Sequence, residues 1–433
     1  MTAKRAAIVG TGHRAQLFTE GLARRDHFDL AALCDPNPVR MAHHNRLLAA
    51  LGQPEARTYH PDDFEKMLQH EGIEEVVVTT VDAHHDAYIV PALRAGCRVV
   101  TEKPMTTDAD RCRRILDTVS RTGSPLAVAF NYRFNPVHEL VRRELAAGSI
   151  GDVLSVHFEW LLDVRHGADY FRRWHRERDK SGGLMVHKAG HHFDLVNWWL
   201  GARPKRVYGA GRLGFYGREN GERHGRRADY VRAHGSAAAA GDPFALHLDE
   251  NEGLRALYLD AEAEDGYHRD RNVFGDGITI EDDMAVLVQY DTGASMSYHL
   301  TAYSPWEGYR VMFNGTGGRL ELEVVESQWQ PPRARLSSAK GAVHGDTALD
   351  NAGGAQILLR PLWEPPRPVG IPQFDHAGHG GGDARMLRTL YDGEPGPAAT
   401  ATDGALALAI GLAANSSFTG GEAVDITDVV SVP

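Results

Sequence analysis

The segment GGLMVHKAGHHFD, residues 182–194, places three histidines, a lysine and an aspartate within eight consecutive positions. In a helix that turns about 100° per residue, His187, His191 and Asp194 share one face, and apolar residues occupy the opposite face. Two histidines one turn apart can bind a metal ion, with Asp194 as a further ligand. Alternatively, a histidine can act as a general base because its pKa lies near neutrality. A solvent-exposed helix face would carry mainly Lys, Glu and Arg, so we favour acid–base catalysis and predict no metal.

A second chemical motif lies near the N-terminus, where a short apolar run leads into GTGHRA, residues 10–15. In this GxGxxA pattern, Gly10 permits a tight turn, Gly12 lets a pyrophosphate approach the backbone, and the following helix N-terminus favours the anion. Asp35 ends the next predicted strand, 23 residues after Gly12. A carboxylate there accepts a hydrogen bond from a ribose 2′-hydroxyl and repels a 2′-phosphate. We therefore predict NAD rather than NADP, although Arg14 offers a phosphate contact.

The elements that position these residues alternate between strand-like and helix-like segments over residues 1–135. Alternation of this length indicates a parallel, doubly wound α/β sheet, the Rossmann fold, for a first domain. Ligands of such sheets bind at the carboxyl ends of the strands. Those ends carry the segments TTVDAHH, TEKP and NYRF, which hold the polar groups that a site requires.

Lys103 lies in the TEKP segment, directly before Pro104 and at the end of a predicted strand. An ammonium group beside a cofactor cleft can donate a hydrogen bond to a substrate hydroxyl and stabilise a developing alkoxide. An ordinary surface lysine is the alternative, and the position of Lys103 at a tight turn before proline disfavours it.

Taken together, the GxGxxA motif, Glu102-Lys103-Pro104 and the downstream GG…H…D pattern resemble the Gfo/Idh/MocA oxidoreductases over about residues 4–215 and 275–325. The resemblance implies an N-terminal Rossmann domain, residues 1–135, and a C-terminal α+β domain, residues 136–433, with a large, open, mostly antiparallel sheet. It also implies bound NAD or NADP and hydride transfer at a carbinol carbon of a sugar, glycoside or cyclitol. Because the open sheet often forms the subunit interface in this family, we expect a homodimer or homotetramer.

The resemblance also implies roles within the histidine cluster. The family's usual pattern is GG-x-x-x-D-x-x-x-H-x-x-D, and His191 and Asp194 match its last two positions. His191 is then expected to remove the hydroxyl proton as hydride leaves the same carbon, with Asp194 orienting its ring and Lys103 polarising the oxygen. His187 replaces the usual aspartate and is followed by Lys188. Neighbouring cations lower histidine pKa values, which suits a neutral base.

The segment TTVDAHH aligns with a family loop that usually reads T-P-N-x-x-H. Thr80 and His85 match this loop, whereas Val81 and Asp82 depart from it.

The polar residues of all these motifs form three predicted sets. The catalytic set is Lys103, His187 and His191. The cofactor-binding set is Gly10, Gly12, His13, Arg14, Asp35, Thr80, His85, Glu102, Lys103 and Asn131. The substrate-binding set is Tyr132, Arg133, Trp174, Lys188, His192, Asp194 and His379.

The second half of the chain alternates in the antiparallel style in VLSVHFEWLL, DDMAVLVQYDTGASMSYHLTAY and YRVMFNGTGGRLELEV. Between about residues 217 and 276 it becomes acidic and irregular. We predict that this stretch is an insertion that covers the cleft or contacts a neighbouring subunit.

Bulk composition narrows the partners and the location. A formal charge of −11 disfavours nucleic acid and anionic membranes as partners, and no segment approaches the roughly 20 apolar residues of a membrane span. Cys34, Cys97 and Cys112 show no CxxC spacing, which disfavours a disulfide framework and fits a reducing compartment. We therefore expect a cytoplasmic protein whose partner is a small-molecule substrate.

Two reactions fit these motifs. The first is NAD-dependent oxidation of a secondary hydroxyl, preferably at C3 of a sugar, glycoside or cyclitol, or the reverse reduction. The alternative is an NAD-dependent glycosidase or lyase that passes through a transient 3-keto sugar without net redox change. The His187-Lys188 pair favours this alternative, as does the segment HAGHGGGD, where His379 and Asp383 would supply a second acid–base pair. The intact GxGxxA and EKP motifs disfavour a third possibility, a catalytically silent binding protein.

Overall fold

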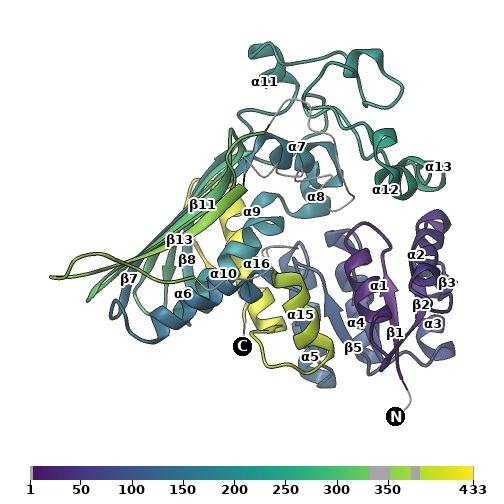
Figure 1. Cartoon of the computed structure of the whole chain (residues 1–433), viewed down its shortest axis with the longest axis horizontal. Helices are drawn as coiled ribbons and strands as arrows, with labels where there is room; N and C mark the ends of the chain where they lie inside the picture. Colours follow the sequence, from purple (N-terminus) through teal and green to yellow (C-terminus); the bar gives the residue numbers. More distant parts are fainter. Residues whose placement is uncertain (1–2, 331–351, 372–380, 433) are drawn as a thin grey trace.

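The computed structural model describes residues 3–330, 352–371 and 381–432, whose elements form two sheets with helices between and around them (Figure 1). The first sheet has the strand order β15-β6-β5-β4-β1-β2-β3. Its strands are β1 (Lys4–Val9), β2 (Phe28–Cys34), β3 (Arg57–Tyr59), β4 (Glu75–Val78), β5 (Arg98–Thr101), β6 (Leu126–Val128) and β15 (Ala399–Thr400). The pairs from β3 to β6 are parallel, and β15 adds antiparallel to β6. The predicted doubly wound parallel sheet is therefore confirmed.

Helices cover both faces of this sheet because successive side chains of a strand point to opposite sides. Ala7 and Val9 of β1 belong to a buried cluster with side chains of α3, α4 and α5. Ala6 and Ile8, which alternate with them, pack instead with α1, α2 and α15. These helices are α1 (Ala15–Ala23), α2 (Pro38–Ala50), α3 (Phe64–His70), α4 (His85–Arg94), α5 (Ala109–Thr122) and α15 (Gly382–Tyr391).

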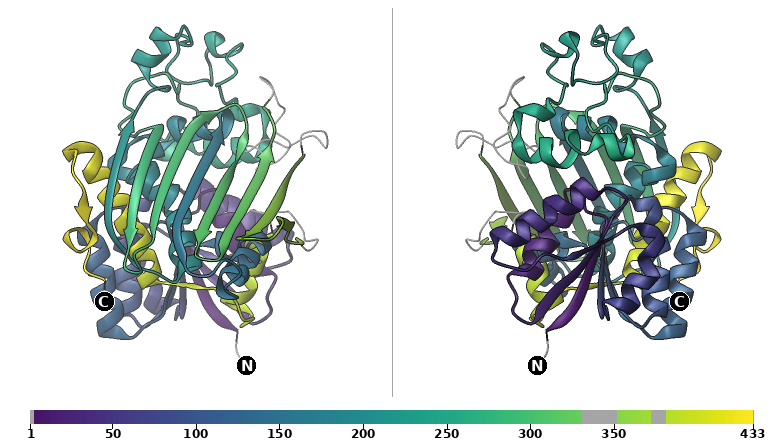
Figure 2. Two further views of the ribbon diagram at one scale, coloured as in Figure 1. Left: turned by 90° about the vertical axis from the view of Figure 1, so that its left-hand side faces the viewer. Right: turned by 90° about the vertical axis from the view of Figure 1, so that its right-hand side faces the viewer.

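The second sheet has the strand order β14-β13-β12-β11-β7-β10-β9-β8-β16. Its strands are β7 (Val153–Asp163), β8 (Pro204–Arg212), β9 (Asp283–Tyr290), β10 (Ser295–Ser304), β11 (Glu307–Gly315), β12 (Gly318–Ser327), β13 (Ala352–Pro361), β14 (Arg367–Pro368) and β16 (Val424–Asp425). β7 and β10 run parallel, and the other described pairs are antiparallel. Buried and exposed residues alternate along β9, as expected for a sheet with one uncovered face, which Figure 2 (left) shows.

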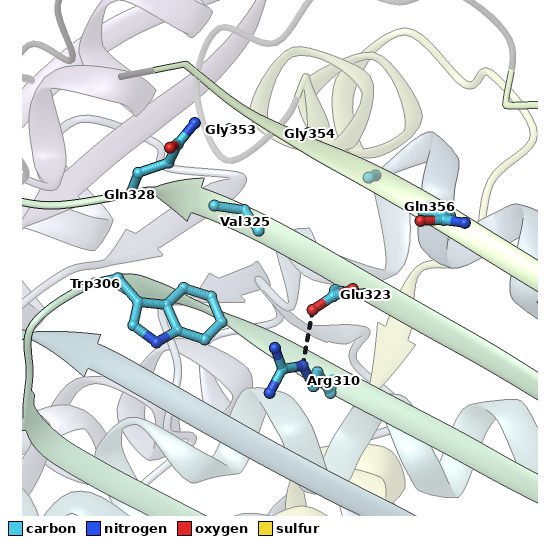
Figure 3. A pocket seen from close by; sticks show the side chains of 9 residues that line it. Trp306, Arg310, Glu323, Val325, Gln328, Gly353, Gly354 and Gln356 are labelled. Atoms are coloured by element: carbon cyan, nitrogen blue, oxygen red, sulfur yellow. Dashed lines mark hydrogen bonds and ion pairs between the residues drawn. The ribbon is translucent and has the colours of Figure 1, made fainter. Parts of the chain in front are cut away.

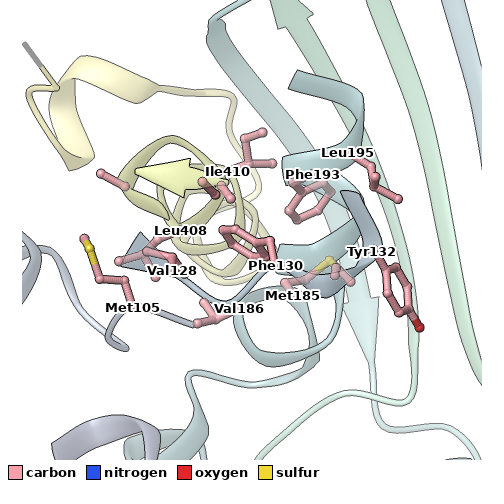
Figure 4. Close-up of a cluster of buried hydrophobic side chains, with 14 of the residues drawn as sticks. Met105, Val128, Phe130, Tyr132, Met185, Val186, Phe193, Leu195, Leu408 and Ile410 are labelled. Atoms are coloured by element: carbon pink, nitrogen blue, oxygen red, sulfur yellow. The ribbon is translucent and has the colours of Figure 1, made fainter. Parts of the chain in front are cut away.

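The helices of the second half lie on the inner face of this sheet and connect it to the first (Figure 1). They are α6 (Pro136–Ala146), α7 (Val164–Arg172), α8 (Arg178–Ser181), α9 (Leu184–His187), α10 (Ala189–Leu200), α16 (Ala401–Gly420) and α17 (Ile426–Val429). Figure 4 shows where the two halves meet: Phe130, Met185, Phe193 and Ile410 are buried in one apolar cluster. This cluster fixes the strand ends of the first sheet relative to α9 and α10.

The predicted insertion lies between β8 and β9, and it contains only short helical segments in its described residues. They are α11 (Arg218–Arg223), η5 (Ala237–Ala239), η6 (Leu248–Glu250), α12 (Glu252–Leu254), the π-helix η7 (Arg255–Leu259) and α13 (Glu262–Asp265). α12 and α13 reach back to the nucleotide-binding half beside α2 (Figure 1). An ion pair of 2.6 Å between Arg40 and Asp265 holds this contact.

The helix predicted to run continuously to Leu200 is instead two helices, because α9 ends at His187 and α10 begins at Ala189. The side chains on either side of this break have different partners: His187 contacts Asp82, whereas Asp194 pairs with Arg133. Within the described ranges, no helix combines the length and the apolar character needed to cross a bilayer.

Candidate active site

The glycine loop after β1 has the geometry of a nucleotide-binding turn. Gly10 has a φ of +85°, and a Cβ atom there would stand 2.6 Å from the backbone nitrogen of Thr80, so only glycine fits. A Cβ atom on Gly12 would meet no atom within 4 Å, which leaves the backbone open to a ligand. Asp35 accepts hydrogen bonds from the backbone N–H groups of Thr11 (2.6 Å) and Asn37 (2.8 Å). These residues fit the adenosine and diphosphate parts of a dinucleotide.

Arg14 is committed to two carboxylates. It forms an ion pair with Asp383 at 3.0 Å and a second one with Glu102. Burial alone would lower the pKa of Arg14, but the two carboxylates outweigh burial and raise it. Asn131 donates a hydrogen bond of 2.8 Å to Asp383. The structure thus unites three residues of the predicted cofactor set and adds Asp383, whose carboxylate serves this ion cluster.

His85 holds two strand-end loops together. Its Nδ1 lies 2.9 Å from the carbonyl oxygen of Pro104, and its Nε2 lies 3.2 Å from that of Thr80. Both carbonyls belong to loops that border the nucleotide turn, and the Lys103-Pro104 peptide bond is cis. His85 therefore positions Thr80 and the EKP turn.

The catalytic candidates Lys103 and His187 meet at the carboxyl end of β5. The Nζ atom of Lys103 lies 3.3 Å from Nε2 of His187 and donates a hydrogen bond of 3.0 Å to its backbone oxygen. On the other side of the ring, Nδ1 of His187 lies 2.5 Å from Asp82. Because Nε2 faces an N–H donor, Nδ1 carries the ring proton and donates it to Asp82. The three side chains form one hydrogen-bonded chain from three separate elements.

Burial and charge set the protonation states of this chain. Burial lowers the pKa of Lys103 to about 8, against the opposing attraction of the Asp82 and Glu102 carboxylates. Burial, Lys103 and Arg173 hold the pKa of His187 well below its usual value, so its ring is neutral near pH 7. Burial raises the pKa of Asp82, and Lys103 opposes that rise. A lysine with a pKa near the working pH is suited to accept and return a proton.

His191 and Lys188 line an aromatic stack beside this chain. The rings of His191 and Tyr132 stack at 4.4 Å. Lys188 lies 4.5 Å from the centre of the Trp160 ring and donates a hydrogen bond of 3.2 Å to the Tyr132 hydroxyl. His192 is fully buried, and its ring stacks on Trp160 at 4.1 Å. The predicted substrate residues Tyr132 and Lys188 thus contact one another, whereas His192 packs in the core.

Arg133 and Asp194 form a buried ion pair. Both oxygens of Asp194 accept hydrogen bonds from Arg133, at 2.6 and 2.7 Å, and Arg133 also contacts Asp403 at 3.0 Å. Asp194 was expected to orient His191, but the structure places its carboxylate on Arg133 instead. The pair links η3 (Asn131–Phe134) to α10 and α16.

Trp174 lies close to His187 and brings with it a residue that the sequence patterns did not indicate. The Trp174 ring is half-buried, stacks on His175 at 3.6 Å and approaches His187 edge-on at 6.0 Å. His175 itself packs against His187 at 4.2 Å. Both residues belong to η4 (Trp174–Arg176), whose RRWHRER sequence has no recognisable catalytic spacing.

Glu307 is a second group that the sequence did not indicate. It lies 2.7 Å from Nδ1 of His166, whose Nε2 lies 3.2 Å from the Tyr170 hydroxyl. Burial and the neighbouring Asp163 raise the pKa of Glu307 to about 8, against the attraction of Lys188. Because Tyr170 also contacts His187 edge-on at 5.7 Å, this chain borders the catalytic candidates.

Three further observations concern a predicted substrate residue, possible metal ligands and a cavity. His379 lies outside the described residues. Within the described ranges, no three His, Cys, Asp or Glu side chains gather as a metal site. A cavity of about 610 Å³ lies elsewhere, on the second sheet between Trp306, Arg310, Glu323 and Gln356 (Figure 3), so it belongs to a different surface from the nucleotide turn.

A parallel sheet with an open glycine turn and a strand-end lysine, joined to a second domain that brings a histidine to that lysine, defines a dinucleotide-dependent oxidoreductase. The model of the oxidoreductase family's NAD-binding Rossmann fold matches residues 4–130, and the model of its C-terminal alpha/beta domain matches residues 142–426. The chain therefore belongs to the Gfo/Idh/MocA oxidoreductase family, whose enzymes act on CH–OH groups. This confirms the resemblance, the fold class and the nicotinamide cofactor.

Three relatives illustrate the similarity. The chain is 34% identical over 412 residues to "Putative oxidoreductase YteT" of Bacillus subtilis (strain 168), covering 90% of this chain and 89% of that one. It is 30% identical over 203 residues to inositol 2-dehydrogenase of Rhizobium meliloti (strain 1021), covering 47% of this chain and 57% of that one. The crystal structure of aldose-aldose oxidoreductase from Caulobacter crescentus with glycerol matches with a TM-score of 0.63 at 16% identity, covering 98% and 99% of the two chains.

Proposed function

We propose that this chain is an NAD-dependent dehydrogenase of a secondary hydroxyl, at C3 of a sugar, glycoside or cyclitol ring, or of the corresponding ketone. The observation that carries the proposal is the 3.3 Å approach of Lys103 Nζ to His187 Nε2 at the end of β5, with Asp82 behind the histidine. Sugar and cyclitol substrates are supported by the names of the inositol and aldose enzymes that the chain resembles.

Lys103 is the proposed proton acceptor. Bound NAD would supply the acceptor for the hydride that leaves the carbinol carbon. In the neutral amine, the two N–H groups of Lys103 face Nε2 and the backbone oxygen of His187, which leaves its lone pair for the substrate hydroxyl. Once Lys103 has taken the hydroxyl proton, the third N–H of the ammonium group can hold the new ketone oxygen. His187 and Asp82 keep the lysine in this orientation.

His191 is the other candidate acceptor, because the family pattern implies that role. We propose that it stays within reach of the substrate ring through its stack on Tyr132, and that Trp174 and Lys188 complete the pocket. Replacing His191 by alanine should abolish hydride transfer while leaving NAD binding intact if His191 is the acceptor. If hydride transfer survives in that variant and fails after Lys103→Met, Lys103 is the acceptor.

The preference for NAD over NADP rests on Asp35 and Arg14. A carboxylate at this position of the fold repels a 2′-phosphate. Arg14 is paired with Glu102 and Asp383, so its charge is already balanced by protein carboxylates.

The first experiment supplies purified enzyme with NAD and nitrophenyl glycosides or free cyclitols, and follows NADH and nitrophenol in parallel. We expect NADH to accumulate without release of nitrophenol, and analysis of the product should place the ketone at C3. Release of nitrophenol without net NADH would instead establish the redox-neutral glycosidase. If neither NADH nor nitrophenol forms with any sugar or cyclitol tested, the proposed substrate class is contradicted.

We further propose a homodimer or homotetramer that associates through the uncovered face of the second sheet. Tyr208 and Leu287 lie opposite each other on β8 and β9, alternate with buried residues, and are 46% and 54% exposed. Light scattering should give two or four times the chain mass of 47.5 kDa, and a monomer would refute the proposal. The free thiols of Cys34, Cys97 and Cys112 support a reducing, cytoplasmic location, which fractionation of the source cells would test.

A further inference from the structure

The insertion contributes a buried arginine to a cluster around Asp169. The guanidinium group of Arg269 lies 2.6 Å from Asp169 and is 2% exposed. Arg173 and Arg172 approach the same carboxylate at 3.0 and 3.3 Å. Asp169 lies on α7 of the second domain, so three guanidinium groups from two segments share one carboxylate.

The positive charge of this cluster exceeds the nearby negative charge. The adjacent Asp270 faces Arg232 at 3.1 Å, and Glu262 faces the same arginine at 2.8 Å, so neither balances Arg269. Within the described part of the chain, Nε and Nη1 of Arg269 have no hydrogen-bond partner. Buried N–H groups of a cation that lack a hydrogen-bond partner are unfavourable. Such a cluster fits an anionic ligand.

The cluster borders the glycine turn. Burial, followed by the charges of Arg269, Arg173 and Arg14, lowers the pKa of His13, the residue that follows Gly12, to about 4. The Nδ1 atom of His13 is also buried and lacks a partner among the described residues. Gly12 is open to a ligand, so the unpartnered Nδ1 atom of His13 and the open backbone belong to adjacent residues of the same turn.

The insertion is anchored at the adenosine end of the same cleft. Asn37, whose backbone N–H holds Asp35, donates a side-chain hydrogen bond of 2.9 Å to the carbonyl oxygen of Ala261. Arg40 forms the 2.6 Å ion pair with Asp265. The insertion therefore contacts the nucleotide-binding half beside the predicted ribose position, and Arg269 follows the contact residue Asp265 by four positions.

We propose that Arg269, supported by Asp169 and Arg173, binds the diphosphate of the dinucleotide, so that the insertion forms a second wall of the cofactor site. The proposal rests on dinucleotide binding and not on the identity of the oxidised sugar. It implies slow release of the cofactor, because the contacts of the insertion with α2 and the diphosphate must break together.

The test compares wild type, R269Q and the control R255Q, which removes a 59% exposed arginine of the same insertion. Calorimetry on the nucleotide-free full chain measures the Kd of NAD, ADP-ribose and adenosine. For R269Q we expect Kd values about tenfold to a hundredfold higher for NAD and ADP-ribose, the worth of one or two charged hydrogen bonds. Adenosine should bind equally well, release of NAD should accelerate, and R255Q should behave as wild type.

Three results would overturn the proposal. One is unchanged binding of NAD and ADP-ribose by R269Q. Another is unchanged NAD binding together with weakened inhibition by an anionic sugar such as glucuronate, which would show that Arg269 serves a substrate anion. The third is an equal loss for all three ligands with a lower Tm, which would show that Arg269 only supports the fold. The conservative variant R269K separates this last case, because it keeps a cation beside Asp169 and should retain the Tm and most of the affinity for NAD.

Discussion

Replacing Asp82 by asparagine should separate the two roles that we give to its carboxylate. The carboxylate accepts the Nδ1 proton of His187 at 2.5 Å, and its charge stabilises the ammonium form of Lys103. Loss of a charged hydrogen bond of this kind is worth about 1.5–3 kcal/mol, so we expect kcat to fall about tenfold to a hundredfold. NAD affinity should stay unchanged, because Asp82 contacts neither Asp35 nor the glycine turn through any described hydrogen bond or ion pair.

The same substitution should also move the pH profile. Asp82 lies within about 8 Å of Lys103 Nζ along the hydrogen-bonded path, where one charge contributes about 2 kcal/mol at an effective dielectric constant near 20. Removing an anion destabilises the ammonium form, so the pKa of Lys103 falls below about 8. The acidic limb of kcat/KM for alcohol oxidation, where the neutral amine is required, should therefore move to lower pH by about 1.5 pH units.

Stopped-flow measurement of NADH formation between pH 6 and 10 provides both quantities, and Asp86→Asn is the matched control. Asp86 is a neighbouring buried carboxylate that pairs with Arg114 at 2.7 Å instead of with His187. If D82N keeps kcat within about threefold of wild type and its acidic limb does not move relative to D86N, the proposed chain from Asp82 to Lys103 is refuted.

Three further predictions follow from the same structure. Lys103→Met should lower kcat/KM about a thousandfold while the Kd of NAD, measured by titration, changes less than threefold. Asp35→Ala should reduce the ratio of kcat/KM with NAD to that with NADP by about tenfold to a hundredfold, and an unchanged ratio would exclude Asp35 as the selective group. Arg133→Met should lower the free energy of unfolding, measured with urea, by about 3–5 kcal/mol because Asp194 stays buried without its partner; a stable variant with a raised KM would instead make Arg133 a substrate contact.

The nucleotide-binding half could be predicted closely because its signals are local. Gly10 is required by its own φ and by the backbone of Thr80 beside it, and the apolar strands follow from burial on both faces. The helix of the histidine segment could not be predicted correctly in the same way. Its periodicity predicted one continuous helix, but the structure divides the segment at Lys188.

The candidate site was predictable where a family motif marks it and hidden where tertiary contacts create it. Lys103 and His187 were found from their motifs, and the structure joins them. His175 and Glu307 come from segments without catalytic spacing, and they reach the site only because η4 and the start of β11 fold against α9 and α7. Arg133, predicted from its motif to bind substrate, is paired with Asp194 by the same kind of tertiary contact.

Two of the departures from the family patterns, Asp82 and His187, are in contact in the structure. Asp82 stands where the first loop usually has asparagine, and His187 stands where the second motif usually has aspartate. The structure places these two side chains 2.5 Å apart, with Lys103 on the far side of the histidine ring. A carboxylate is thus retained beside the lysine but moved back by the width of one imidazole ring. Because the intervening ring is neutral, Lys103 still experiences the negative charge of Asp82 in addition to that of Glu102, and burial lowers its pKa to about 8 against both carboxylates. A chain with Asp82 and an aspartate at position 187 would place two carboxylates in contact, whereas a chain with His187 and an asparagine at position 82 would leave Lys103 with Glu102 but without the charge of Asp82.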